Sequence, residues 1–583
     1  MEKRWVLKKQ GDPQVVKRLS SELNIDPTLA NLLVQRGVNT YDEAKAYFRP
    51  KLEHLHDPFL MKDMHLAVER IRRAVTGGEK ILIYGDYDVD GTTAVSLVYT
   101  FLKDFYDEVY FYVPDRYDEG YGVSYKGIDH AKKIGVSLII ALDCGIKAVE
   151  KIEYARTLGI DFIICDHHRP GEKLPPAHAI LDPKRNDCEY PYKELSGCGV
   201  GFKLIQAYAS KNNIRFEKLR KFLDLVVVSI ASDIVPITGE NRILAYYGLK
   251  YLNEKPRPGI EAILSVSKAG RNNNSATAVK RDLTINDLVF IVGPRINAAG
   301  RIESAKNSVE LLISDDVAKA YTLGQQINVM NTERKNLDSL ATSQALEMIL
   351  ANEEMLKASS TVVYDPSWHK GVIGIVASRL IETYYKPTVV LTLSDGMITG
   401  SARSIKGFDI YDAVDSCGEY LEHFGGHTYA AGLSIKPENF ENFKKRFEEY
   451  VVEHIEESML VPEIEIDSKL YLKDINTKFY RILKQFAPFG PGNMSPVFQT
   501  NNLIDTGYAR IVGNNHLKLT VVQLEVSGFP ISSIAFQQGE NIDYIKTGGA
   551  FNICYHIEEN EWNGQKSLQL NIKDIKVPGH DQE

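Results

Sequence analysis

The sequence lacks long apolar runs, paired cysteines, internal repeats and low-complexity tails. Because no stretch reaches about 18 apolar residues, we expect no transmembrane helix and no membrane association. The N-terminal segment, residues 1–12, is charged and has no apolar centre, so we expect no signal peptide. The six cysteines include no CxxC pair, which argues against a zinc site or a disulfide framework. These absences predict a cytoplasmic protein with reduced thiols.

The charge balance also limits the class of protein. The formal net charge of −8 argues against a uniformly basic surface for nucleic acid. A local basic groove remains compatible with it, because the field near a cleft depends on how the charges are distributed. At 583 residues the chain exceeds one hydrophobic core, so we expect three or four domains.

Short apolar segments alternate with helical patterns in the first half of the chain. The predicted strands are residues 81–86, 109–115, 138–143, 161–166 and 179–182. This alternation predicts an α/β fold with a parallel sheet that is covered by helices. Residues 200–265 are predicted to be mostly helical and include a buried segment, FLDLVVVSIASDIVPI.

The rest of the chain divides by its periodicity. Residues 314–350 have no proline and carry apolar residues at helical spacing, which fits a connecting helix or, equally, a helix buried inside one domain. Short alternating strands near the C-terminus predict a small β-barrel. We predict N-terminal helices over residues 1–50 and a parallel-sheet domain over 51–313. A connecting helix over 314–358, a second α/β domain over 359–454 and a barrel over 455–583 follow.

Four aspartates at the ends of predicted strands are candidate ligands. They are Asp86, Asp143, Asp166 and Asp182. Ligands of open parallel sheets bind at the carboxyl ends of the strands, so these carboxylates are expected to face one crevice. A single aspartate is more simply explained as a helix N-cap. N-capping does not account for Asp86, Asp88 and Asp90 together.

Three carboxylates so close together repel one another, and a divalent cation would neutralise them. Oxygen ligands suit Mg²⁺ or Mn²⁺, and the imidazole of His167 in the string DHH shifts the preference toward Mn²⁺. Asp233 follows another buried segment. Alone, His167 would be interpreted as a polar loop residue, but three acidic motifs in the same chain favour a ligand.

The strings GDYDVDG, LDCG, DHH and SD, in this order, resemble the four motifs of the DHH phosphoesterase superfamily. Later strings narrow the resemblance to the RecJ family of single-strand-specific exonucleases. They are SGCGVGFKL, VGPRINAAGRIESA, WHKGVIGIVASRL, GSARSIKGFDI, FGGHTYAAG and APFGPGNMSPVF. The resemblance implies a DHH domain over residues 51–313, a DHHA1 domain over 359–454 and an OB-type barrel over 455–583.

The resemblance also implies site residues by position. The implied metal site, for two ions of Mn²⁺ or Mg²⁺, consists of Asp86, Asp88, Asp90, Asp143, His167 and Asp233. Asp143 would bridge the ions and Asp86 would have a secondary role. His168, catalytic together with Asp143, would hydrogen-bond a phosphoryl oxygen or protonate the leaving group, and we favour the first role.

Substrate contacts are implied outside the metal site. The implied residues are Arg116, Arg295, Arg301, His369, Ser401, Arg403 and His427. Ser401 and Arg403 would form a pocket for a 5′ phosphate. For Arg403 alone, a surface salt bridge is an equally good interpretation. The barrel aromatics Tyr508, Phe529, Phe536 and Trp562 are expected to be core residues more often than platforms for bases.

Three departures from the family pattern stand out. Tyr84 occupies a position where many superfamily members have a histidine, which would weaken one metal site. Cys144 follows Asp143 where asparagine is common, and we expect this thiol to be a packing residue. The chain is also expected to lack the extra C-terminal domain of longer RecJ proteins.

The leading hypothesis is a 5′-to-3′ exonuclease that hydrolyses single-stranded DNA to 5′ mononucleotides by two-metal catalysis, in DNA repair and recombination. The alternative is a DHH phosphodiesterase for short oligonucleotides, cyclic dinucleotides or phosphoadenosine phosphate, although such relatives generally lack the barrel. A non-catalytic replication scaffold is disfavoured, because all the metal carboxylates are present. The resemblance suggests a monomer whose partners are a single-strand-binding protein and a RecQ-type helicase.

Overall fold

The computed structural model describes residues 2–267, 281–524, 526, 528–562 and 564–577. The chain forms two compact units. The smaller unit comprises Met1–Arg4, Ala298–Ser304 and Gln326–Ile464, and the larger unit comprises Trp5–Asn297, Ala305–Gln325 and Glu465–Glu583. No helix of the described residues combines the length and the apolar character that a membrane crossing needs.

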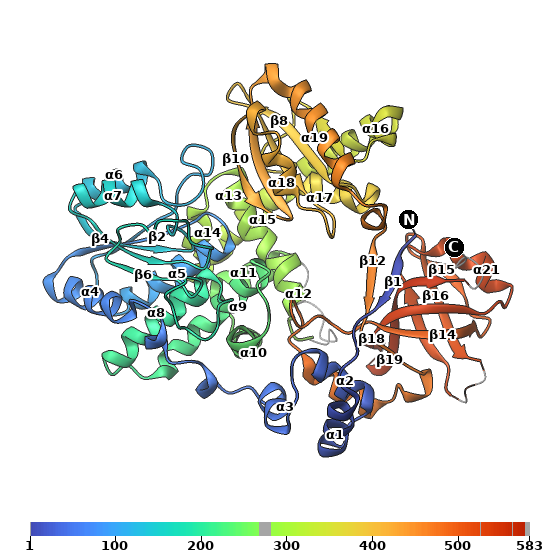
Figure 1. Ribbon diagram of the computed structural model, residues 1–583. Coiled ribbons are helices and arrows are strands. Elements are labelled where there is room, and N and C mark those ends of the chain that lie inside the picture. Colours follow the sequence, from blue (N-terminus) through green and yellow to red (C-terminus); the bar gives the residue numbers. More distant parts are fainter. Residues whose placement is uncertain (1, 268–280, 525, 527, 563, 578–583) are drawn as a thin grey trace. The chain divides into compact units, whose positions relative to one another are not determined.

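A five-stranded parallel sheet lies in the larger unit (Figure 1), with the order β3-β2-β4-β5-β6. Its strands are β2 (Lys80–Gly85), β3 (Val109–Tyr112), β4 (Val136–Leu142), β5 (Asp161–Cys165) and β6 (Ala179–Leu181). Residues 81–85 and 138–142 are fully buried. Continuous burial is typical of parallel strands with both faces covered, so the predicted α/β class is confirmed.

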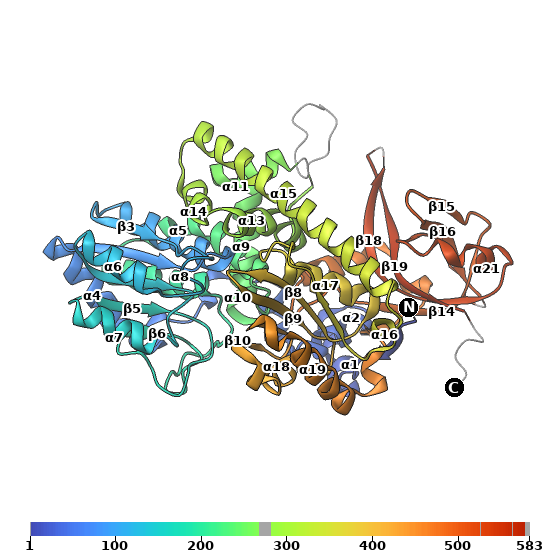
Figure 2. The same cartoon turned by 90° about the horizontal axis from the view of Figure 1, so that it is seen from above.

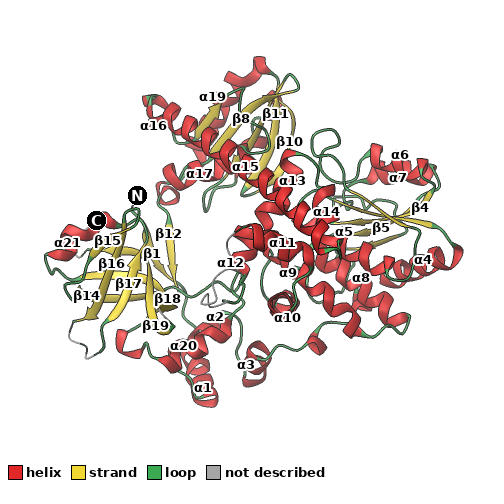
Figure 3. Ribbon diagram, turned by 180° about the vertical axis from the view of Figure 1, so that it is seen from behind, coloured by secondary structure: helices red, strands yellow, loops and turns green. Residues whose placement is uncertain are grey.

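Helices cover both faces of this sheet (Figures 1 and 3). One face carries α6 (Tyr125–Lys133) and α7 (Val149–Thr157); the other carries α4 (Met64–Gly77), α5 (Val89–Lys103) and α8 (Gly197–Lys211). Helix α9 (Leu223–Ser232), from the predicted buried segment, packs between α5 and α10 (Gly239–Glu254). The following helices are α11 (Pro258–Val266), α12 (Ile285–Asp287), α13 (Gly293–Ile302) and α14 (Lys306–Ile313).

A seven-stranded sheet forms the predicted barrel, and β14 closes it by pairing with β16 as well as with β18. Its strands are β13 (Ser468–Lys469), β14 (Phe498–Asp505), β15 (Arg510–Val512), β16 (His516–Gln523), β17 (Ile531–Ala535), β18 (Phe551–Trp562) and β19 (Gln565–Lys576). Two short helices accompany them, α20 (Thr477–Leu483) and α21 (Ile542–Lys546). The alternating burial of β16 and β17 places every second side chain in the barrel core.

The N-terminal helices share the core of this barrel. They are α1 (Pro13–Leu23), α2 (Pro27–Gln35) and α3 (Tyr41–Phe48), and the strand β1 (Arg4–Leu7), which the sequence did not predict, precedes them. Asp12, Asp26 and Thr40 accept hydrogen bonds from the first backbone amides of the three helices. Leu32 and Ala44 belong to the same buried cluster as barrel residues such as Phe498.

The smaller unit contains a mixed sheet of order β10-β11-β9-β8-β7, in which only β7 and β8 are parallel. Its strands are β7 (Thr361–Tyr364), β8 (Thr388–Ser394), β9 (Met397–Arg403), β10 (Leu421–His427) and β11 (Ala430–Ile435). The helices α17 (Ile373–Tyr384), α18 (Ile410–Asp415) and α19 (Phe440–His454) pack with it, and the strand β12 (Glu463–Ile466) follows.

The predicted connecting helix is α15 (Val317–Leu350), one continuous helix in Figure 2, and the short α16 (Glu353–Lys357) follows it. Near its C-terminal end, Ala345 and Ile349 are buried in a cluster with Trp368 and Val372. This half of the helix therefore belongs to the core of the smaller unit. The composition of the segment did not distinguish a connecting helix from a helix buried inside one domain.

Candidate metal centre

The carboxyl ends of three parallel strands carry the predicted ligands. Asp86 follows β2, Asp143 follows β4, and His167 lies two residues after β5. Asp233 is the C-cap of α9 and completes the group from a different element. The parallel order of the sheet thus places side chains that are far apart in the sequence at one edge, as the strand-end aspartates indicate.

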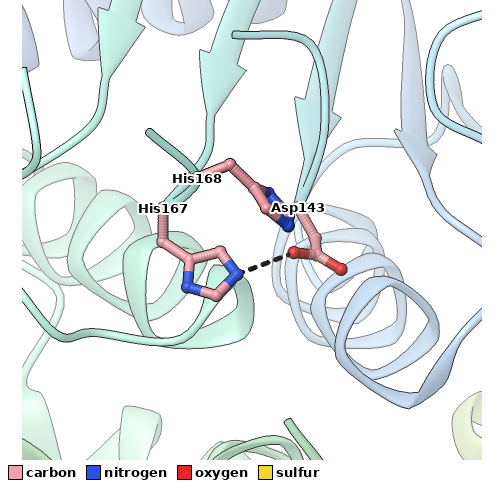
Figure 4. A group of neighbouring side chains, drawn as sticks. All are labelled: Asp143, His167 and His168. Atoms are coloured by element: carbon pink, nitrogen blue, oxygen red, sulfur yellow. Dashed lines mark ion pairs between the residues drawn. The ribbon is translucent and has the colours of Figure 1, made fainter. Parts of the chain in front are cut away.

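His167 lies at the middle of this group. Its Nε2 atom forms an ion-pair contact with Asp143 (Figure 4) and lies 3.1 Å from Asp143 Oδ1, 3.6 Å from Asp233 Oδ2 and 3.7 Å from Asp90 Oδ2. One ligand atom from each of Asp90, His167 and Asp233 lies within 4.8 Å of the others, and the same holds for Asp143, His167 and His168. These distances suit donor atoms that surround a shared cation.

Several of these atoms are buried without a hydrogen bond. Among the described residues, none donates to Asp143 Oδ1 or Asp86 Oδ2, and the two ring nitrogens of His167 make no hydrogen bond. Unsatisfied buried polar atoms are rare and costly in folded proteins. Carboxylate oxygens are the donors that Mg²⁺ and Mn²⁺ prefer, and one imidazole nitrogen among them favours Mn²⁺, so these residues fit a divalent cation.

The pKa shifts of these groups also favour a bound cation. Burial, reinforced by neighbouring carboxylates, raises the pKa of Asp86, Asp88, Asp143 and Asp233 above the ordinary range. Burial also lowers the pKa of His167, which favours the neutral imidazole that binds metals. A cation would reverse the repulsion among the carboxylates and make the ionised forms favourable.

The first turn of α8 holds Asp90 in place. Both oxygens of Asp90 accept backbone hydrogen bonds of 2.7 Å, from Gly197 and Cys198, and Ser229 Oγ donates to Oδ1 at 2.7 Å. A Cβ atom on Gly197 would lie 2.6 Å from Asp143 Cβ, so only glycine allows this approach. The glycine-rich start of SGCGVGFKL is the sequence signal for this contact, which the pattern of acidic residues did not reveal.

Asp88 and Asp86 have different surroundings. Asp88 is the N-cap of α5, and its Oδ1 accepts from the Gly91 amide at 2.9 Å. Asp86 Oδ1 accepts from the Gly122 amide at 3.2 Å. The Tyr84 hydroxyl, at the position of the missing histidine, donates to the Gly122 carbonyl at 3.0 Å. Tyr84 thus supports the loop that contacts Asp86.

His168 faces different partners from His167. Its Nδ1 lies 2.8 Å from Asp166 Oδ1, and its Nε2 lies 3.3 Å from the Tyr121 hydroxyl. Burial opposes the charge on both groups, but the hydrogen bond and the attraction between them raise the pKa of His168 to about 9 and lower that of Asp166 to about 2. From the sequence, Asp166 is expected only to face the crevice with the other strand-end carboxylates, and Tyr121 is not singled out, because nothing in the spacing shows which ring nitrogen of His168 each contacts.

Two other residues that attracted attention in the sequence lie outside this group. Asp182 is buried at the end of β6, its Oδ1 accepts from the Lys184 amide at 2.7 Å, and burial raises its pKa to about 7. Cys144 is buried in an apolar cluster with residues such as Ile164, in keeping with a packing role.

Two of the arginines expected to contact substrate belong to the larger unit. The Arg116 guanidinium carbon lies 4.9 Å from the centre of the Tyr87 ring, and its charge opposes the rise in the pKa of Asp86. Arg295 is mostly buried in α13 and donates from Nη1 to the Ile291 carbonyl at 2.8 Å.

The smaller unit holds the predicted phosphate pocket. Arg403 Nη1 donates to Ser401 Oγ at 2.9 Å and to the Ala402 carbonyl at 2.8 Å, and burial lowers the pKa of the guanidinium. No carboxylate of the described residues pairs with Arg403 in an ion pair, which disfavours the surface salt bridge. A Cβ on Gly374, in the first turn of α17, would lie 2.9 Å from Arg403 Nη2. A helix N-terminus, a hydroxyl and a guanidinium therefore converge there.

The other predicted substrate contacts in this unit lie near the segment that precedes α17 or at the end of β10. Arg301 Nη1 donates to the Gly371 carbonyl at 2.7 Å, and His369 Nδ1 accepts from the Gly371 amide at 3.1 Å. His427 is exposed at the end of β10.

Three known domain families match the chain. Residues 80–230 match the DHH family, N-terminal domain; residues 357–453 match the DHHA1 domain; and residues 466–574 match the RecJ OB domain. The chain is 34% identical to the single-stranded-DNA-specific exonuclease RecJ of Salmonella typhimurium, over 95% of this chain and 96% of the relative. The RecJ of Bacillus subtilis is 36% identical, over 98% of this chain and 71% of the relative. The chain belongs to the RecJ family.

Solved RecJ structures share its fold. A crystal structure of RecJ from Thermus thermophilus in complex with Mn²⁺ has a TM-score of 0.83 and 24% identity, and the match covers 99% of this chain and 80% of that one. A crystal structure of exonuclease RecJ bound to manganese has a TM-score of 0.58 and 28% identity, covering 70% of this chain and 97% of that one.

The RecJ OB domain presents aromatic side chains that the sequence analysis expected in the core. Phe529 is 89% exposed, Tyr508 67% and Phe536 51%. The expectation was wrong for these three residues, because an aromatic residue in a strand-rich segment carries no signal of which face it occupies. The side chain of Trp562 lies outside the described residues.

Proposed function

We propose that this RecJ-family protein is a single-stranded-DNA-specific exonuclease that uses divalent metal ions to hydrolyse phosphodiester bonds. The observation that supports it most directly is the meeting of His167 Nε2 with carboxylates of Asp90, Asp143 and Asp233 at the carboxyl edge of the sheet. RecJ relatives are named as exonucleases of this specificity, and a RecJ structure is described as bound to manganese.

Five residues would hold two ions of Mn²⁺ or Mg²⁺, with Asp143 shared by both, and Asp86 would have a supporting role. These ligands are Asp88, Asp90, Asp143, His167 and Asp233. When bound, the ions neutralise the charge of the phosphodiester and supply a nucleophile at neutral pH. Asp90, fixed by two amides and a hydroxyl, would keep its orientation through the reaction.

His168 would act on the scissile phosphate. Asp166 holds its Nδ1, so the ring is oriented with Nε2 beside the Tyr121 hydroxyl. With a pKa of about 9 the ring is protonated at neutral pH and can donate from Nε2 to a phosphoryl oxygen. Water adds to phosphorus as the bond to the 3′ oxygen of the terminal nucleotide breaks. A 5′ mononucleotide leaves, and the shortened strand keeps a 5′ phosphate.

The pocket of Ser401, Arg403 and the first turn of α17 would bind the 5′ phosphate of the strand. A planar guanidinium and helix amides are suited to a phosphate, and burial strengthens their interaction with a charged ligand. A strand anchored by this phosphate is degraded from its 5′ end. Arg116, Arg295, Arg301, His369 and His427 would contact the rest of the strand.

The barrel would hold the strand beyond the cleavage site. Tyr508, Phe529 and Phe536 offer exposed rings for stacking on bases, and Arg510 lies opposite Lys518 on neighbouring strands. This module and the 5′-phosphate pocket favour long strands over cyclic dinucleotides. The complete ligand set disfavours a non-catalytic scaffold. By resemblance to the RecJ family, the enzyme would be a cytoplasmic monomer that acts in DNA repair and recombination. Its partners would be a single-strand-binding protein and a RecQ-type helicase.

A labelled-strand assay with Mn²⁺ tests this function. It compares a long 5′-labelled single strand, its duplex and a 3′-labelled copy. We expect early release of the label as a mononucleotide only from the 5′-labelled single strand. Early mononucleotide release from the 3′-labelled copy, or equal rates on the duplex, would overturn the proposal.

A further inference from the structure

Arg242 is a buried arginine at the meeting point of three segments of the larger unit. It lies in the first turn of α10, nine residues after Asp233, and is only 5% exposed. Its guanidinium carbon is 3.9 Å from the centre of the Tyr47 ring in α3. Its nitrogens donate to the backbone carbonyls of Phe486 at 2.9 Å, Ala487 at 3.1 Å, Tyr47 at 3.2 Å and Gln485 at 3.4 Å.

The partners of Arg242 are carbonyl groups and an aromatic face. Among the described residues, no carboxylate forms an ion pair with it, and burial lowers its pKa. A buried charge is tolerated only when hydrogen bonds and favourable dipoles replace water. Here the carbonyls of residues 485–487 accept from the two Nη atoms and the Tyr47 ring covers the guanidinium face, while the buried Nε makes no hydrogen bond to the described residues. The arrangement is therefore stable only while α3, α10 and this loop stay in contact.

The loop packs directly on the segment that follows Asp233. The Ile237 amide donates to the Pro491 carbonyl at 2.7 Å. A Cβ on Gly492 would lie 3.0 Å from Thr238 Cγ2, so Gly492 packs tightly against the Thr238 side chain. This loop is the APFGPGN part of the motif APFGPGNMSPVF, and it leads into β14 of the barrel.

Glu240, two residues before Arg242, connects the first turn of α10 to the metal centre through hydrogen bonds. Glu240 is 1% exposed and accepts from Lys203 Nζ at 3.1 Å and from the Tyr190 hydroxyl at 2.5 Å. Lys203 belongs to α8, whose first turn holds Asp90. The first turn of α10 therefore contacts both the helix behind a metal ligand and the loop that enters the barrel.

We infer that Arg242 is a positioning residue that keeps the RecJ OB domain at a fixed position relative to the metal centre. This inference rests on the proposed function. A strand held at two sites binds more tightly than at either one, provided that the sites are fixed at a spacing the strand can bridge. Loosening the Arg242 contacts would lower the affinity for strands that reach the barrel. It would leave the chemistry on shorter strands unchanged.

The test compares Arg242→Gln with wild type on two 5′-phosphorylated strands, one of about 40 nucleotides and one of about four, too short to occupy a barrel site as well. For Arg242→Gln we expect KM on the long strand to rise about tenfold with kcat within about twofold. Both constants on the short strand should match wild type, as should Mn²⁺ affinity measured by calorimetry. Arg242→Lys should restore part of the lost affinity.

Arg70→Gln is the matched control. Arg70 is equally buried in the same unit, but it pairs with Glu79 and Asp161 at the opposite edge of the sheet. This variant should lower thermal stability and leave the ratio of long-strand to short-strand KM unchanged. A similar ratio change in Arg70→Gln would show a general effect of destabilisation and overturn the inference.

Other outcomes are also decisive. A folded Arg242→Gln with wild-type KM on the long strand, or with equal losses on both strands, overturns the inference. If Arg242→Gln does not fold, Tyr47→Leu removes the aromatic face but leaves the carbonyls, and the same split in KM is expected from it. A wild-type protein that fails to shorten either strand would contradict the proposed function itself. A working wild type with an unchanged ratio in the variants contradicts only the role of Arg242.

Discussion

His168 Nδ1 lies 2.8 Å from Asp166 Oδ1, whereas the adjacent His167 directs Nε2 to Asp143 Oδ1 at 3.1 Å. The two rings of one dipeptide thus have separate chemical settings. His167 has a lowered pKa among carboxylates, and His168 has a raised pKa beside one buried carboxylate. The first is suited to binding a cation, and the second is suited to donating a hydrogen bond to an anion.

Asp143→Asn should abolish hydrolysis while leaving the fold intact. The substitution keeps the shape of the side chain but removes the negative charge that would bind the ions. Loss of a residue that only supports a ligand costs about 10–100-fold, so loss of this ligand should exceed about 100-fold in kcat/KM. Calorimetry should show weaker Mn²⁺ binding, and circular dichroism serves as the folding control. Retention of wild-type Mn²⁺ affinity would contradict the assignment.

Asp166→Asn should lower kcat by about 10–100-fold and change its pH dependence. In the wild type, His168 stays protonated up to pH values near 9, so activity that needs the protonated ring should decline only above that pH. Without the carboxylate, the pKa of His168 should fall toward the ordinary value of about 6.5. The alkaline limb of the kcat profile should then move to lower pH. An unshifted limb would mean that another group controls it.

The metal-free protein should lose stability as the pH rises from about 7 to about 9, because His168 keeps its proton up to about pH 9 in the folded state and only up to about 6.5 in the unfolded state. Burial raises the folded pKa of Asp86, Asp88 and Asp143 above the unfolded value of about 3.9, so the folded state binds more protons and stability falls as they dissociate. The raised pKa of His168 has the same sign, with its contribution lost as the pH passes about 9. The lowered pKa of His167 acts with the opposite sign, but only near and below pH 6.5.

Thermal unfolding with a chelator and with Mn²⁺ measures this effect. With Mn²⁺ the carboxylates stay ionised, so the decline should vanish and the stabilisation by the metal should be larger at the higher pH. Asp143→Asn should flatten the metal-free curve, since it removes one repelled carboxylate. A metal-free protein whose melting temperature rises over this window would refute the electrostatic account.

The strand-end aspartates could be found from the sequence because parallel strands need only apolar runs and an adjacent acidic residue to be recognised. Asp86 and Asp143 follow β2 and β4 as expected, and the α/β class follows from the same pattern. Contacts made by backbone amides leave no such trace. The amides of Gly197 and Cys198 hold Asp90, and the pattern of acidic residues gives no sign of them; the sequence marks this contact only through Gly197, where a Cβ would meet Asp143.

Packing between segments far apart in the chain also could not be predicted from the sequence. The N-terminal helices look like a separate extension in sequence, yet Leu32 and Ala44 share a core with barrel residues more than 400 positions away, such as Phe498. An amphipathic helix shows that one face is buried but not what covers it.

Arg403→Ala should weaken binding of strands with a 5′ phosphate. A hydrogen bond to a charged group contributes about 1.5–3 kcal/mol, so KM should rise about 10–100-fold, with kcat less affected. Strands with a 5′ hydroxyl should show little change, because they lack the group that Arg403 would bind. Arg446, whose side chain is 34% exposed in α19, provides the control variant Arg446→Ala. Equal losses on both kinds of strand would contradict a phosphate pocket.

Phe529→Ala and Tyr508→Ala should weaken binding of single strands without lowering stability. Both rings are mostly exposed, so their removal creates no cavity, whereas stacking on a base contributes about 1–3 kcal/mol. Phe498→Ala is the contrasting variant: Phe498 is fully buried in the barrel core, and its truncation should cost about 3–5 kcal/mol of folding free energy. Fluorescence anisotropy with a labelled strand measures binding, and urea unfolding measures stability. Because the two rings do not hold the barrel together, wild-type affinity in a Phe529→Ala, Tyr508→Ala double variant would place the strand on another face of the barrel.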